Sequence, residues 1–140
     1  MKIICLAACL VLAFNNSVSQ TRDEEAIRKV LEIQQVAWNS GSVEDFMKSY
    51  WVSDSLMFIG KSVTYGWRQT LDNYKKRYPD TASMGKLAFR LLEFKQLSKT
   101  YYFVVGKWDL QRSIGNVGGY FTLLFKKIED RWVIIVDHTS

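Results

Sequence analysis

The second half of the chain holds four long runs of β-branched, aromatic and aliphatic residues, which constrain the fold more than any other feature. These runs cover residues 86–97, 101–112, 120–127 and 132–139. Turn-sized gaps separate them, and none contains the proline that interior strands exclude. Four successive strands with short connections predict an antiparallel meander.

The segment before this meander has the spacing of helices. From Ile27 to Trp38, apolar residues recur at the spacing of one helix face, and Gln34 is the single polar member of this stripe. Thr21 and Glu24 have the spacing of a capping box, so we expect the first helix to begin after Thr21. Gly41 is typical of the residue that follows a helix.

Four shorter elements are expected between this helix and the meander. Ser42 can cap a short helix, and residues 67–78 have helical spacing up to Pro79. Residues 56–59 and 61–65 are expected to be short strands. Three helices followed by a meander predict an α+β fold with the helices on one face of the sheet.

Residues 1–19 have the pattern of a secretory signal peptide. Lys2 precedes an uninterrupted apolar run to Phe14, and Ser17 and Ser19 supply small residues before Gln20. The apolar run is too short for a stable membrane anchor. A lipoprotein box ending at Cys9 is the alternative, and we favour it less because it leaves an apolar stretch behind the lipid. We expect a secreted or periplasmic domain of residues 20–140.

Composition excludes several classes of site. Both cysteines lie within residues 1–19, and His138 is the only histidine, so we expect no metal site and no cofactor. The chain has 19 basic and 14 acidic residues, but its basic runs are short, so we expect no nucleic-acid partner.

Strict alternation along the last strand predicts which side chains share a face. Trp132 and His138 then lie on one face and Asp137 on the other. Several strands are apolar on both faces, whereas one layer of helices covers only one. We therefore expect a homodimer formed through the sheet.

The order of elements resembles the nuclear transport factor 2-like superfamily, in its SnoaL-like and ketosteroid-isomerase-like branch. The resemblance covers residues 23–140 and depends on three segments: Trp38 to Ser42, the pair Gly66-Trp67, and 120–140. The last strand is also similar to that of the association domain of calcium/calmodulin-dependent protein kinase. The resemblance implies a cystatin-like cone, in which a curved, mostly antiparallel sheet and three N-terminal helices enclose a pocket.

The resemblance to ketosteroid isomerases also identifies two positions to compare. Their aspartate base falls at or near Ile59, and their tyrosine donor falls at Gln34. Ile59 cannot carry a proton, and Gln34 is a weaker donor to an oxyanion than tyrosine. Isomerase chemistry by the usual pair is therefore not expected.

The remaining candidates for acid–base catalysis are His138, Asp54 and Tyr50. The resemblance turns His138 toward the pocket, and its side chain titrates near neutral pH. The expected wall of the pocket consists mainly of large aromatic residues with a few polar ones. These are Gln34, Trp38, Met57, Trp67, Tyr74, Trp108, Tyr120 and Arg112.

Three functions stay open from the sequence. The first is binding of an unknown small molecule without catalysis, favoured by the aromatic set and the missing isomerase pair. The second is an isomerase, cyclase or dehydratase that uses His138 with Asp54 or Tyr50. The third is a homo-oligomeric interaction module.

Overall fold

The computed structural model describes the backbone of residues 4–140 and the side chains from Gln20 onward. The predicted signal peptide and its two cysteines lie outside these described side chains. Within the part of the chain that is described, no helix has the length and hydropathy needed to cross a membrane.

A six-stranded sheet forms the centre of the molecule. Its order is β2-β1-β6-β5-β4-β3, and every pair is antiparallel except β1 with β6, which is parallel. The strands are β1 (Met57–Ile59), β2 (Val63–Tyr65), β3 (Lys86–Gln96), β4 (Tyr101–Gln111), β5 (Val117–Ile128) and β6 (Arg131–Thr139). The predicted meander of β3 to β6 is confirmed.

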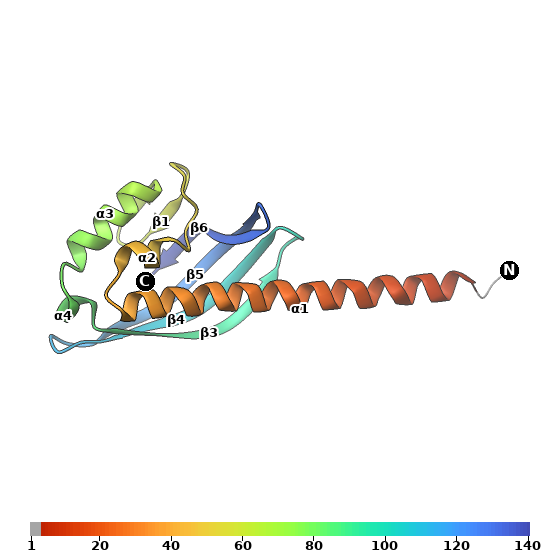
Figure 1. Cartoon of the computed structure of the whole chain (residues 1–140), viewed down its shortest axis with the longest axis horizontal. Helices are drawn as coiled ribbons and strands as arrows, with labels where there is room; N and C mark the ends of the chain where they lie inside the picture. The colour runs from red at the N-terminus through yellow and green to blue at the C-terminus, as the bar shows by residue number, and fades with distance from the viewer. Residues whose placement is uncertain (1–3) are drawn as a thin grey trace.

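Four helices accompany this sheet among residues 4–140, and the α+β class is confirmed. They are α1 (Ile4–Asn39), α2 (Val43–Met47), α3 (Trp67–Arg77) and α4 (Thr81–Met84). Figure 1 shows α1 crossing the curved sheet, with α2 and α3 near the β1 edge. The helices and the sheet share one apolar core, in which Ile27, Leu31 and Phe125 are almost completely buried.

The start of α1 differs from the prediction. The helix begins at Ile4 and passes through Thr21, so Thr21 is not its N-cap. No proline or glycine lies between Ile4 and Thr21 to stop the helix on that side. The end was predicted correctly, because Gly41 has a φ of 84° and follows α1 closely.

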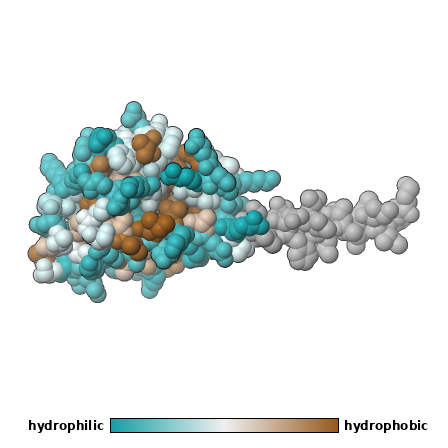
Figure 2. All heavy atoms as spheres, viewed as in Figure 1, coloured by the Kyte–Doolittle hydropathy of each residue, from teal (hydrophilic) through white to brown (hydrophobic). Residues whose placement is uncertain are grey.

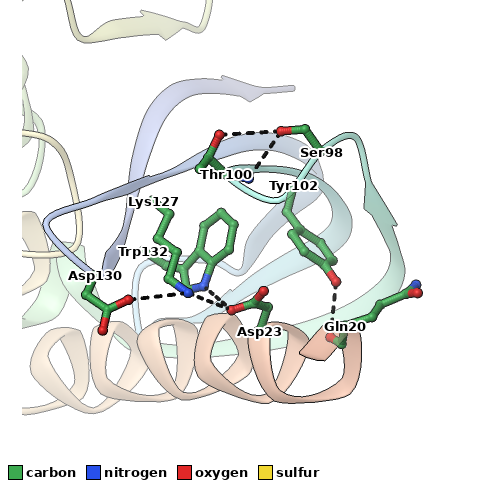
Figure 3. A network of polar contacts seen from close by, with 8 residues as sticks. All are labelled: Gln20, Asp23, Ser98, Thr100, Tyr102, Lys127, Asp130 and Trp132. Carbon is green, nitrogen blue, oxygen red and sulfur yellow. Dashed lines mark hydrogen bonds and ion pairs between the residues drawn. The ribbon is translucent and has the colours of Figure 1, made fainter. Parts of the chain in front are cut away.

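A buried polar cluster fastens α1 to the β5–β6 hairpin (Figure 3). Asp23 accepts hydrogen bonds from Lys127 Nζ at 3.0 Å and from Trp132 Nε1 at 3.3 Å. The Tyr102 hydroxyl donates to the carbonyl of Gln20 at 3.1 Å. These bonds fix the helix against the sheet from residue 20 onward.

A β-bulge in β6 overturns the predicted alternation of faces. Phe125 pairs with Ile134, but Leu124 pairs with Val136, so Ile135 is an extra residue. Every side chain after Ile135 therefore lies on the face opposite to the one that strict alternation predicts. Asp137 points inward and is 4% exposed, whereas His138 lies on the outer face and is exposed.

The outer surface is mixed in character. Figure 2 shows separate hydrophobic patches among hydrophilic residues on the face that carries α1. On this helix Ile33 and Val36 are exposed to solvent. On the sheet, Phe103, Val105 and Leu124 are half-buried, and they alternate with core residues such as Val104 and Leu123, so they face away from the core.

Candidate functional site

A cavity of about 480 Å³ lies between the helices and the inner face of the sheet. Its volume is in the range typical of sites for small molecules. Strands β3 to β6 supply the floor, α1 and α3 supply the sides, and the β1–β2 turn borders the mouth. Gly106 allows this packing, since a Cβ atom there would lie 2.3 Å from the ring of Phe121.

Aromatic rings make up much of the wall. Trp38 packs edge-on against Phe46 and Tyr78, with centroids 5.0 and 4.9 Å apart. Tyr74 contacts Phe46 and Phe58 in the same way. This interlocked cluster fixes the shape of the wall and presents mainly apolar surface to the cavity.

Asp137 is the buried carboxylate of this cavity. Tyr50 Oη donates to its Oδ2 at 2.7 Å, and Thr139 Oγ1 donates to its Oδ1 at 2.7 Å. Tyr50 is itself held in place, because the residues on either side of it pair with Ile134 of β6. The carboxylate is therefore fixed by two neutral donors from two different segments.

Burial changes the acid–base properties of this group. It raises the pKa of Asp137 from 3.8 to about 6, although the hydrogen bonds from Tyr50 and Thr139 and the nearby His138 act to lower it. Burial and the Asp137 charge raise the pKa of Tyr50 and of Tyr74 well above their usual value. Near neutral pH the tyrosines are thus donors, while Asp137 can exchange a proton.

The sequence-predicted catalytic residues are only partly together. Tyr50 lines the cavity beside Asp137. His138 borders the cavity but lies on the outer face, where the register of β5 and β6 sets it opposite Thr122. Asp54 is exposed before β1 and is absent from the cavity wall.

Of the predicted pocket residues, Gln34, Trp38, Tyr74 and Trp108 line the cavity. Helical spacing and strand alternation were sufficient to find them, because their helices and strand are regular at these positions.

Four predicted pocket residues lie elsewhere. Tyr120 is 53% exposed on the outer face of β5, and Lys107 Nζ lies 4.5 Å from its ring centroid. Arg112 donates to the Gly115 carbonyl at 2.7 Å in the β4–β5 loop.

Met57 and Trp67 also lie outside the cavity wall. Met57 alternates with Phe58, and it is Phe58 that lines the cavity. Trp67 is the first residue of α3, and its Nε1 donates to the carbonyl of Met47 at the end of α2 at 2.9 Å.

Of the two positions compared with ketosteroid isomerases, one lies in the cavity wall and the other does not. Ile59 pairs with His138 across β1 and β6 and is absent from the cavity wall. Gln34 is 2% exposed and faces the cavity. Asp137 is the acidic residue that sequence reasoning placed on the wrong face; a lone charge in the apolar run of β6 was the available signal.

Comparison with solved structures shows the family of this chain. An NTF-2-like protein of unknown function from Shewanella oneidensis MR-1 is 44% identical, with a TM-score of 0.81. The match covers 84% of this chain and 98% of that one. The chain belongs to the NTF-2-like family. No protein-family model matches it, and no curated protein matches it significantly.

More distant solved structures show the fold alone. A cystatin-like domain of unknown function from Nostoc punctiforme is 16% identical, with a TM-score of 0.71, over 86% of this chain and 77% of that one. A protein from Xanthomonas campestris assigned to the calcium/calmodulin-dependent protein kinase II association domains is 14% identical, with a TM-score of 0.63. That match covers 81% of this chain and 84% of the other.

Proposed function

We propose that this NTF-2-like chain binds a small, mostly apolar molecule in the cavity beside Asp137. The observation that carries the proposal is an aromatic-walled cavity of about 480 Å³ that contains a fixed, buried carboxylate. Apolar walls with a few convergent polar groups are the usual form of a small-molecule site. The related proteins of unknown function are consistent with this role and do not name a ligand.

Binding of the neutral fluorescent dye N-phenyl-1-naphthylamine tests the proposal. Ser62 borders the mouth of the cavity, whereas its exposed neighbour Val63 does not. The wild-type chain and Val63→Trp are expected to bind the dye saturably at one site. Ser62→Trp is expected to weaken binding about tenfold or more, because the indole obstructs the mouth. Equal binding by the two variants, or no binding by the wild type, would contradict the proposal.

A second candidate function is acid–base catalysis by Asp137. It is favoured by one observation, the pKa of about 6 in an apolar cavity. Tyr50 would act as the positioning donor for this carboxylate. The sequence led us to expect His138 with Asp54 or Tyr50. Asp54 is absent from the cavity wall, and His138 lies on the outer face, away from Tyr50.

The probe substrate 5-nitrobenzisoxazole tests this candidate, because its ring opens when a base removes the carbon-bound proton and the N–O bond breaks. The ionised form of Asp137 is the base, so the rate is expected to rise with pH around a midpoint near 6. Asp137→Asn is expected to reduce the rate to that of the buffer. A rate unchanged in this variant would exclude Asp137 as the base.

Two further proposals concern the whole chain. Export with removal of residues 1–19 is supported by the pattern of their sequence. A homodimer through the outer face of the sheet is supported by Phe103, Val105 and Leu124, which are apolar and face away from the core.

A further inference from the structure

Two buried hydrogen-bond donors of the cavity wall have no partner among the described residues. They are Gln34 Nε2 on α1 and Trp108 Nε1 on β4. Both side chains line the cavity, and Gln34 is only 2% exposed. Native proteins satisfy nearly all buried polar groups, so each exception calls for a specific explanation.

Three other tryptophans among the described residues have a protein acceptor for the indole N–H. Trp38 Nε1 donates to the Met84 carbonyl at 3.0 Å, and Trp67 Nε1 donates to the Met47 carbonyl at 2.9 Å. Trp132 Nε1 donates to Asp23. Trp108 differs from these three tryptophans because its ring borders the cavity without a protein acceptor.

The two unpartnered donors belong to neighbouring segments of the cavity wall. Gln35 Oε1 accepts from the backbone N–H of Phe89 at 2.7 Å, which holds this turn of α1 against β3. Phe89 is in turn the cross-strand partner of Trp108. Gln34 and Trp108 therefore belong to walls that meet around Phe89.

Asp137 does not serve as their acceptor. It lies two strands from β4 in the sheet, opposite Leu123, which pairs with Val104. Strand geometry then separates the Cα atoms of Asp137 and Trp108 by about 15 Å. The Asp137 oxygens are also occupied by Tyr50 and Thr139.

The missing partner must be a hydrogen-bond acceptor, because an indole N–H can only donate. The neighbouring wall is apolar, and a charged acceptor buried there would be costly. We propose that the ligand is an apolar carbonyl compound whose neutral oxygen accepts hydrogen bonds from Gln34 Nε2 and Trp108 Nε1. This inference rests on the proposed function and adds the chemical class of the ligand.

Competition between two matched probes and N-phenyl-1-naphthylamine tests the inference. Fluorenone and fluorene have the same rigid tricyclic frame, but only fluorenone carries a carbonyl oxygen. Wild-type protein is expected to bind fluorenone about tenfold or more tightly than fluorene, since the carbonyl gains donors that fluorene leaves unpaired. Gln34→Met and Trp108→Phe should each reduce that ratio, and the double variant should bring it close to one.

Trp67→Phe is the matched control, because it also removes an indole N–H but lies outside the cavity wall. It is expected to keep the wild-type ratio. Thermal unfolding of each variant checks that the fold is intact. If the dye binds but fluorenone and fluorene compete equally, or neither competes, the carbonyl inference is wrong and the proposed function stands. If the dye itself does not bind, the proposed function fails.

Discussion

Asp137 combines three properties at one position: burial, two fixed hydrogen-bond donors and a pKa near the middle of the usual pH range. Ionising a carboxyl in apolar surroundings costs free energy, which the donors recover only in part. A chain that needed only stability would be served better by an apolar residue here. We therefore interpret the free-energy cost of this buried carboxyl as part of a function performed in the cavity.

The pH dependence of folding follows from this pKa. A carboxyl whose pKa is raised on folding favours the folded state at low pH, and its contribution is lost as pH rises through the folded-state value. Between pH 3.8 and pH values above 6, ionisation of Asp137 is expected to lower the free energy of unfolding by on the order of 3 kcal/mol. The variant Asp137→Asn lacks this group, so wild type should lose stability relative to it over that interval.

Urea denaturation of both proteins at pH 4 and pH 7.5 measures this difference. Thr139→Val is a second variant, which removes a donor that lowers the pKa of Asp137 and should move the change to higher pH. A wild-type protein that gained stability relative to Asp137→Asn on going to pH 7.5 would contradict the assignment.

Individual site residues were predictable where their element keeps a regular period. Gln34 and Trp38 follow from the helical stripe, and Trp108 from regular alternation along β4. Asp137 was not predictable, because Ile135 is one of three consecutive β-branched residues and nothing in their sequence distinguishes a bulge from a regular strand. Asp54 and Arg112 were overestimated, because polar residues at the ends of strands serve loops as readily as sites.

At the scale of elements, one buried carboxylate of α1 forms hydrogen bonds with both β5 and β6. Asp23 is 9% exposed and accepts from both Lys127 and Trp132. Replacing Asp23 by alanine leaves the indole N–H of Trp132 buried without an acceptor. The expected loss is about 1–3 kcal/mol in the free energy of unfolding.

Asp130 provides the control for this prediction. Its side chain is 94% exposed and reaches Lys127 Nζ only at 3.5 Å. Asparagine also suits its φ of 63°, so Asp130→Asn should change the stability by less than about 0.5 kcal/mol. Urea denaturation of the two variants under the same conditions compares them. Equal losses would mean that Asp23 acts only as another surface charge.

Most elements were predictable because their signals are long. The four long strands and α3 agree with their predicted positions to within a few residues. Helix α4 was missed because four residues carry too little periodicity, although its Asp80–Ser83 capping box is present in the sequence. Strand β5 begins at Val117 rather than residue 120, since Gly118 and Gly119 look like a loop in sequence.

At the scale of the whole molecule, the proposed dimer face is central to the sheet. Val105 lies on the outer side of β4, next to Thr122 of β5. Val105→Glu is expected to convert a dimer to a monomer in sedimentation velocity at micromolar concentration, because it buries a charge in the interface. Val52→Glu is the control, since this 74% exposed residue precedes β1 and lies away from that face. A wild-type protein that sediments only as a monomer would exclude the interface.

Export is tested by the mass of the mature protein. Chain expressed in a bacterium with its own N-terminus and recovered from the periplasm should begin at Gln20, according to the small residues that precede this position. Intact mass spectrometry measures the cleavage site directly. Recovery of the uncleaved chain from the cytoplasm alone would argue against a signal peptide.

The extra residue in β6 also has a consequence for how this scaffold can evolve. Deleting Ile135 would restore a regular strand with the present faces, whereas pairing Ile135 with Leu124 would remove the bulge and exchange the faces of every residue after it. The cavity would then receive the imidazole of His138 in place of the carboxylate of Asp137, with no substitution in its wall. A one-residue shift of register thus separates two acid–base chemistries, which gives a lineage with this architecture a short route from one kind of reaction to another.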